Sequence, residues 1–147
     1  MYDKALQSAT RMLAGREHSV QEMTRKLLQK DFSAEIVDEV ISSLVKARVL
    51  SDARFAEAYV RMRSAKGYGP SRIRNELRER GVEGETLEQG FEENAIDWVA
   101  LAAETRARKF GEDLPEDFAG QAKQMRFLQY RGFTQAQINA AVKGLDY

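Results

Sequence analysis

The sequence predicts an all-α protein made of three tandem three-helix repeats in an elongated array that can curve. Hydrophobic residues recur at helical spacing almost throughout the chain, and no convincing stretch alternates as a strand would. The chain has only 2 prolines and is rich in good helix formers. A short motif also occurs three times, at intervals of about 50 residues, which is typical of helical repeat arrays. Because one such unit buries little surface alone, we expect neighbours to pack end to end.

The repeated motif has a leucine, a basic residue three positions later, and then a turn residue and an apolar residue. Its copies are RKLLQKDF at 25–32, NELRERGV at 75–82 and RFLQYRGF at 126–133. We expect the leucine in the core and the basic residue in the last helical turn, where it complements the helix dipole. Glycine suits the corner that follows. Asp31 replaces this glycine in the first copy, so that corner is expected to be looser or differently shaped.

The predicted repeats span residues 1–50, 51–96 and 97–147. Three helices are expected in the first repeat from apolar residues at helical spacing, namely Leu6, Ala9 and Leu13, then Met23 and Leu27, then Ile36, Val37, Val40, Ile41 and Leu44. Ser19 and Glu22 form a predicted capping box at the start of the second helix.

Start and stop signals also divide the later repeats. Either Ser51 or Asp52 can cap the helix that follows it. Gly69 and Pro70 suit the cap and the first position of the next helix. Further signals are a left-handed corner expected at Gly81 and at Gly132, a capping box at Thr134 and Gln137, and core positions at Phe55, Tyr59 and Trp98.

Composition favours a folded protein of the cytoplasm. Of the 147 residues, 43% are hydrophobic and 31% are charged, which suffices for a core and argues against disorder. No apolar run approaches the length of a membrane span, and the first residues, MYDKALQSAT, lack the pattern of a signal peptide. The chain has no cysteine, which excludes disulfides and thiolate metal sites.

The sequence does not support an enzyme, a cofactor or a metal. His18 is the only histidine, and we expect it at the surface or in a cap. No metal-ligand spacing, nucleophile elbow or phosphate loop occurs. The glycine-rich KGYGP is neither preceded by a strand nor followed by Lys-Ser or Lys-Thr, and the acidic GEDLPED at 111–117 is expected to be a solvated connector.

Charge is unevenly distributed although the formal net charge is zero. Residues 51–80 carry eight basic and four acidic residues, net +4, whereas residues 81–97 carry six acidic and no basic residues, net −6. A blanket electrostatic grip on DNA is therefore not expected, and a local basic face stays possible. Alternating charge that simply keeps small helices soluble explains any single cluster equally well.

Basic residues without an acid three or four positions away are candidates for binding an acidic partner. A local acid neutralises a helical cation, so unneutralised cations indicate a phosphate or carboxylate ligand. Tertiary neighbours, for instance from residues 83–93, can supply the acid instead. The predicted partner-binding residues are Arg63, Lys66, Arg74, Arg78, Lys123 and Arg126.

These stretches together resemble the RecX family of regulatory proteins over about residues 4–144. The longest matching stretch is SDARFAEAYVRMRSAKGYGPSRIRNELRERGV, which resembles the central repeat of the family. REHSVQEMTRKLLQKDF is similar to the first repeat, and RKFGEDLP with KQMRFLQYRGF is similar to the third. Asp31 departs from the glycine that the family commonly has there.

The resemblance implies a non-enzymatic modulator of the RecA recombinase. RecX proteins are similar in having three three-helix units, and they bind the RecA filament on single-stranded DNA in its groove. They dampen filament extension, ATP hydrolysis, strand exchange and the coprotease activity that triggers the SOS response. A monomer with no membrane partner is expected, and weak direct affinity for DNA is compatible with this role. The alternative is a stand-alone DNA-binding helical module.

Overall fold

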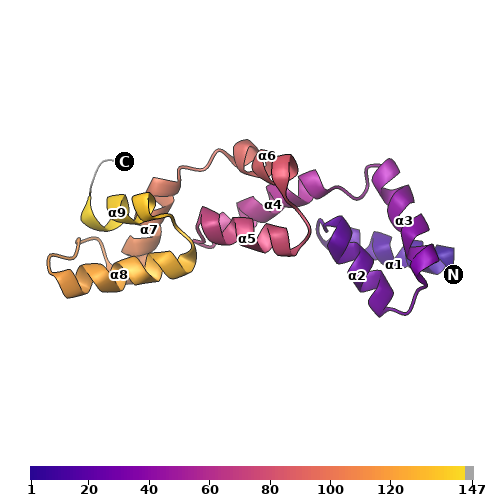
Figure 1. The fold of residues 1–147 in the computed structure, drawn as a ribbon, viewed down its shortest axis with the longest axis horizontal. Helices are drawn as coiled ribbons and strands as arrows, with labels where there is room; N and C mark the ends of the chain where they lie inside the picture. Colours follow the sequence, from indigo (N-terminus) through magenta and orange to yellow (C-terminus); the bar gives the residue numbers. More distant parts are fainter. Residues whose placement is uncertain (145–147) are drawn as a thin grey trace. The chain divides into compact units, whose positions relative to one another are not determined.

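A computed structural model describes residues 1–144, which form nine α-helices and no strand (Figure 1). The helices are α1 (Tyr2–Gly15), α2 (Val20–Gln29), α3 (Ala34–Lys46), α4 (Asp52–Ala65), α5 (Pro70–Glu79), α6 (Gly84–Asn94), α7 (Trp98–Phe110), α8 (Phe118–Arg131) and α9 (Gln135–Lys143). The predicted all-α fold is confirmed. Within this part of the chain no helix is long and apolar enough to cross a membrane.

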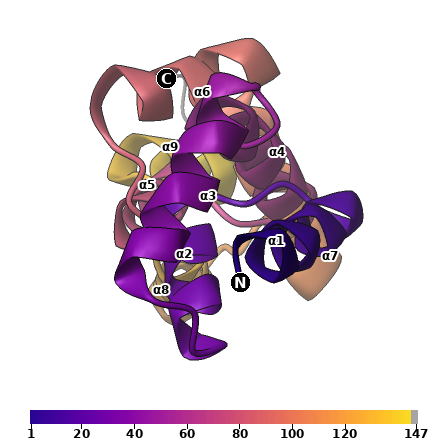
Figure 2. The same cartoon turned by 90° about the vertical axis from the view of Figure 1, so that its right-hand side faces the viewer.

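Helices α1, α2 and α3, drawn in indigo and purple in Figure 2, pack on one another. Six of the ten residues predicted from helical spacing are buried in their core, and the other four, Leu6, Leu13, Ile36 and Ile41, are partly buried and pack against it. Ala5 and Leu50 join the core without having been predicted. Its buried members are Ala5, Ala9, Met23, Leu27, Val37, Val40, Leu44 and Leu50. Tyr2 closes one edge, where its hydroxyl donates to Ser43 Oγ over 2.9 Å.

Helices α7, α8 and α9 form the C-terminal three-helix set around Ala102, Leu128, Phe133, Ile138, Ala141 and Val142. Trp98 is half-buried and packs against this core. The Arg106 side chain is 3% exposed and donates to the Gln124 side chain over 3.2 Å and to the backbone carbonyl of Glu112 over 3.1 Å. The acidic connector before α8 is therefore attached to α7 through its backbone, while most of its residues are exposed, as predicted for a solvated segment.

The middle helices α4, α5 and α6 contribute to two compact units. One unit contains residues 1–58 and Leu77–Glu93, and the other contains Tyr59–Glu76 and the residues from Asn94 onward. In the first unit α6 lies close to α4, since a Cβ atom at Gly90 would lie 2.9 Å from the Ala56 Cβ. The predicted repeat boundaries after residues 50 and 96 stay predictions. Both lie between helices, and the last three residues of the predicted third repeat lie outside the described residues.

The three motif corners share a left-handed turn residue. Gly81 and Gly132 have φ values of 82° and 97°, as predicted, and Asp31 adopts the same region with φ of 67°. Each of them donates its backbone N–H to the carbonyl three residues earlier. Aspartate thus tolerates this conformation here, so the first corner keeps the turn. The first corner differs from the other two in the residue that follows it, because Phe32 is only half-buried.

The predicted caps begin the helices as expected. Ser19 forms a capping box with Glu22 at α2, and a second box begins α9. Ser51 caps α4, since its Oγ accepts the backbone N–H of Arg54 over 3.2 Å. Asp52, the alternative cap, instead accepts the backbone N–H of Val20 over 2.8 Å and so satisfies a free donor at the start of α2.

Of the two places expected for His18, the surface or a cap, the surface is wrong, because the residue is 2% exposed. Its Nδ1 lies 3.0 Å from the Arg16 carbonyl oxygen and its Nε2 lies 3.0 Å from Lys26 Nζ. The Lys26 ammonium can only donate, so Nε2 is the acceptor and the ring is neutral. Burial lowers the pKa of His18, and the positive charges of Arg16 and Lys26 lower it further.

We predict that Leu27→Ala lowers the free energy of unfolding by about 2–5 kcal/mol, because it leaves a cavity in the first core. Leu27 is 0% exposed, whereas the adjacent Leu28 is 45% exposed. Leu28→Ala is therefore the matched control and should change stability by less than about 1 kcal/mol. Urea denaturation followed by circular dichroism measures both. Equal losses for the two variants would contradict the packing of α2.

We predict that the stability contribution of a neutral His18 is complete above its ordinary pKa of 6.5 and declines as the pH falls below that value. In that range the unfolded chain binds a proton that the folded chain does not. The melting temperature measured at intervals from pH 8 to pH 5 should fall more steeply for the native protein than for His18→Gln. Parallel curves would show that the histidine does not resist protonation.

Candidate functional site: an arginine–tyrosine cluster

The glycine-rich turn between α4 and α5 is fixed to the end of α8. Gly69 donates its backbone N–H to the Arg131 carbonyl over 2.7 Å, and Ser71 donates to the Gly132 carbonyl over 2.9 Å. A Cβ atom at Gly69 would lie 2.5 Å from backbone atoms of Gly132 and Phe133. Only glycine allows this approach, so the turn is a backbone clamp between segments about 60 residues apart in sequence.

Three arginines surround the Tyr68 ring, which this turn carries. The guanidinium carbons of Arg63, Arg72 and Arg131 lie 3.9, 4.5 and 4.7 Å from the ring centroid. Arg63 comes from α4, Arg72 from α5 and Arg131 from the last turn of α8. A guanidinium within about 6 Å of an aromatic face is attracted by the ring quadrupole. The clamp thus positions one tyrosine among three cations.

Glu76 is the acid that pairs with two of these arginines. Arg63 donates to its two carboxylate oxygens over 2.9 and 3.0 Å, and Arg72 donates to Oε2 over 3.2 Å. The Tyr59 hydroxyl donates to Oε1 over 2.9 Å. Burial opposes ionisation of the carboxyl, but the hydrogen bonds from Arg63, Tyr59 and Arg72 outweigh it and lower the pKa of Glu76. The carboxylate is therefore charged at neutral pH and holds both guanidinium groups in place.

Arg131 has no carboxylate partner among the described residues. Its Nη1 donates to the Lys66 carbonyl over 3.0 Å, which orients the guanidinium without neutralising it. Its guanidinium carbon also lies 5.2 Å from the Phe127 ring centroid, and that of Arg72 lies 5.2 Å from the Tyr130 ring centroid. The Tyr130 side chain is 74% exposed. We call Arg63, Tyr68, Arg72, Glu76, Tyr130 and Arg131 the arginine–tyrosine cluster.

The chemistry of this cluster is that of a binding surface. The cluster contains three guanidinium groups and one carboxylate, so the cluster has a surplus of positive charge next to aromatic rings. Guanidinium forks match phosphate and carboxylate groups, and exposed aromatic rings stack on nucleobases. Within residues 1–144, no group of histidine, aspartate and glutamate side chains could hold a metal ion.

The premise that the predicted binding residues lack an acidic neighbour is wrong for Arg63, where the alternative of a tertiary acid holds. Arg63 has no acid three or four positions away, but Glu76 on α5 pairs with it. Neither Arg74 nor Arg78 is without an interaction partner in the structure. A test limited to neighbours three or four positions away cannot detect such tertiary partners. Whether these residues contact another molecule stays a prediction.

The other predicted residues have exposed side chains. Lys66 lies in the turn after α4, while Lys123 and Arg126 lie on α8. Among the residues that the structure describes, no carboxylate pairs with these three cations. The structure places Lys66 beside the cluster, through the hydrogen bond to its carbonyl, and leaves Lys123 and Arg126 outside it.

Sequence reasoning missed Tyr68, Tyr130 and Arg131 as members of a site. The pairing of Arg72 with Glu76 follows from their spacing of four positions on one helix, but nothing in the sequence predicts that Arg63 shares that carboxylate. The signal that points to them is a tyrosine near basic residues in both segments of the clamp: Tyr68 lies two positions after Lys66, and Tyr130 directly precedes Arg131.

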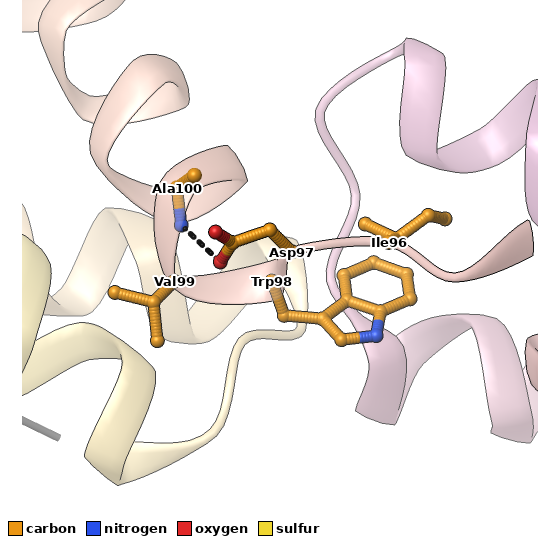
Figure 3. Close-up of a pocket in the computed structure, with 5 residues that line it drawn as sticks. All are labelled: Ile96, Asp97, Trp98, Val99 and Ala100. Carbon is orange, nitrogen blue, oxygen red and sulfur yellow. Dashed lines mark hydrogen bonds between the residues drawn. The ribbon is translucent and has the colours of Figure 1, made fainter.

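A pocket of about 440 Å³ at the start of α7 does not offer comparable chemistry (Figure 3). It is lined by Ile96, Asp97, Trp98, Val99 and Ala100. The lone carboxylate among them, Asp97, accepts the Ala100 backbone N–H over 3.0 Å and so serves as the helix cap. Figure 3 shows the Trp98 indole extending beside Ile96, away from this cap.

Comparison with known proteins assigns the chain to a family. Family models described as the first, second and third three-helix domains of RecX match residues 5–44, 51–90 and 95–142. The chain belongs to the RecX family. The predicted resemblance and the three three-helix domains are thereby confirmed.

Individual RecX proteins match nearly the whole chain. "Regulatory protein RecX" of Pseudomonas entomophila is 40% identical over 139 residues, which cover 95% of this chain and 90% of that protein. The protein of the same name from Cronobacter sakazakii is 38% identical and is covered to 94%, with 99% of this chain matched. The crystal structure of RecX from Lactobacillus salivarius shares the fold, with a TM-score of 0.80, 23% identity and coverage of 99% of this chain and 96% of that one.

We predict that Glu76→Gln lowers the free energy of unfolding by about 1–3 kcal/mol, because four hydrogen bonds lose their charged acceptor. Glu79→Gln is the matched control on the same helix, since the Glu79 side chain is 75% exposed and should change stability by less than about 0.5 kcal/mol. Chemical denaturation at pH 7 compares them.

The Glu76 contribution should also depend on pH. The folded pKa of Glu76 lies below its ordinary value of 4.5, so its contribution is complete above that pH and is lost as the pH falls below it. The stability difference between the native protein and Glu76→Gln should therefore narrow between pH 5 and pH 3. A constant difference over that range would contradict the role of the carboxylate.

Proposed function

We propose that this RecX-family protein regulates the RecA recombinase in the cytoplasm, as a non-enzymatic monomer that binds the RecA filament on single-stranded DNA. Binding in the filament groove dampens filament extension, ATP hydrolysis, strand exchange and SOS coprotease activity, and so acts on DNA repair and recombination. The observation that carries the proposal is the match of all three RecX domains in order along the chain.

The arginine–tyrosine cluster supports an acidic partner. A protein that kept its arginines only for internal pairing would balance them with acids, but Arg131 lacks one among the described residues and Arg63 shares one with Arg72. The ligand in this proposal is a phosphate of the filament DNA or a carboxylate on the recombinase surface. Three linked domains can also contact neighbouring protomers together, which favours the assembled filament over free subunits by multivalency.

A second candidate function is stand-alone binding of single-stranded DNA. Tyr130 favours it, because an exposed tyrosine beside arginines is a typical stacking platform for bases. This function would show tight DNA binding without RecA and a steep dependence on salt. The formal net charge of zero opposes it as the main activity.

The direct test is the single-stranded-DNA-dependent ATPase of RecA with increasing, substoichiometric amounts of this protein. We expect slower ATP hydrolysis and slower filament growth. An unchanged rate at every ratio would overturn the proposed function. Binding to short oligothymidylate without RecA, measured at several salt concentrations, distinguishes the second candidate.

We predict that the double variant Lys66→Glu, Lys123→Glu inhibits RecA at least about fivefold more weakly, because both exposed ammonium groups would face an acidic partner. Its melting temperature should stay nearly unchanged, since no described carboxylate pairs with either lysine. Lys4→Glu with Arg11→Glu, two exposed cations of α1, is the charge-matched control. Full inhibition by the first variant would exclude these lysines from the interface without excluding the function.

A further inference from the structure

A second surface of the C-terminal three-helix set, a groove along α8 and α9, lies apart from the arginine–tyrosine cluster. Its volume is about 330 Å³, which is enough for a bulky side chain and the peptide around it. Its α8 residues are separated by one or three positions and therefore share one face of the helix. The lining residues of this α8–α9 groove are Phe118, Gln121, Ala122, Met125, Arg126, Gln129, Gln135 and Lys143.

The apolar part of the groove is incompletely covered by the chain. Phe118 is 86% exposed, the highest value among the exposed large hydrophobic side chains of the described residues. Ala122 and Met125 are half-buried and follow it along the same face. Exposed aromatic surface next to methionine is typical of sites that take up an apolar side chain, because methionine adapts its shape to the ligand.

The polar part of the groove selects for negative charge. Arg126 and Lys143 both contribute to the lining, together with three glutamines, and no lining residue in the described part of the chain carries a carboxylate. Among the residues that the structure describes, neither cation is paired with an acid. Lys143 lies in the last turn of α9, where it complements the helix dipole, but Arg126 has no such role.

We propose that the α8–α9 groove binds an acidic peptide segment that carries an apolar anchor side chain. The anchor packs between Phe118 and Met125, and the flanking carboxylates pair with Arg126 and Lys143. This inference rests on the proposed function, in which the acidic segment belongs to the recombinase protein and not to its DNA. Nucleic acid fits less well, because glutamines and apolar groups interrupt the basic lining that a phosphate backbone would follow.

The two faces of α8 differ in chemistry. Tyr130 and Arg131 belong to the cluster with surplus guanidinium groups, and neither lines the groove. Arg126 is the predicted binding residue that does line it. A protein ligand at the groove and an acidic ligand at the cluster can therefore be detected independently.

The experiment compares Phe118→Ala with Leu114→Ala in binding to preassembled RecA filaments on oligothymidylate. Leu114 is 46% exposed and does not line the groove, so it is the matched apolar control. We expect Phe118→Ala to bind the filament at least about fivefold more weakly, and Leu114→Ala to bind like the native protein. Circular dichroism melting of both variants verifies folding. Equal binding by Phe118→Ala and the native protein would overturn the inference while leaving the proposed function intact.

A photoreactive benzoylphenylalanine at position 118 identifies the class of ligand in the same filaments. The expected cross-link joins it to a RecA segment in which aspartate or glutamate flanks an apolar residue, as read by mass spectrometry of the digest. A cross-link to DNA alone, or to a RecA segment without acidic residues, would overturn the inference. If the native protein fails to bind filaments at all, the proposed function and this inference both fail.

Discussion

The backbone clamp between the α4–α5 turn and the end of α8 is the constraint on which the candidate site depends. Gly69 and Gly132 bring two backbones so close that no side chain fits between them. The contact fixes the position of Tyr68 and places Arg131 over its ring. Neither segment could form this site alone, since the arginines come from three different helices. The glycine-rich KGYGP stretch is therefore part of a fixed junction within one compact unit.

The charge balance at this junction supports the proposal that it binds an acidic partner as well as stabilising the fold. The bidentate pair of Arg63 with Glu76 joins one guanidinium to one carboxylate. This pair alone would be balanced in charge. The addition of Arg72 and Arg131 raises the positive charge without adding a described acid. Cation–π contacts with Tyr68 offset part of the repulsion among the guanidinium groups, because each faces the same ring. An incoming anion would remove the remainder.

Local signals predicted most of the fold. Ser19, Thr134 and Pro70 begin their helices where the sequence places them, and the aligned Leu27, Leu77 and Leu128 are all fully buried. These features depend on residues a few positions apart, so periodicity and capping rules can predict them.

The candidate site was less predictable because it depends on tertiary contacts. Arg63 and Glu76 are 13 positions apart, and Gly69 and Arg131 are 62 apart. No helical periodicity relates such positions. The burial of His18 is a similar case, since it depends on Lys26 one and a half turns into the next helix and on the packing of the first core. The sequence of an all-helical chain therefore predicts its helices better than it predicts the surfaces that those helices form.

Helix α8 connects these observations, because its buried side determines what its other sides present. Gln124 and Leu128 are buried, one held by Arg106 and the other in the core. With that side fixed, helical geometry directs Tyr130 and Arg131 toward the clamp, and Phe118 and Met125 toward the α8–α9 groove. A single rigid helix therefore presents a cationic–aromatic surface and an apolar groove at a fixed separation. Such an arrangement favours a partner that offers negative charge and an apolar side chain together, which a protein assembled on DNA does and free DNA does not.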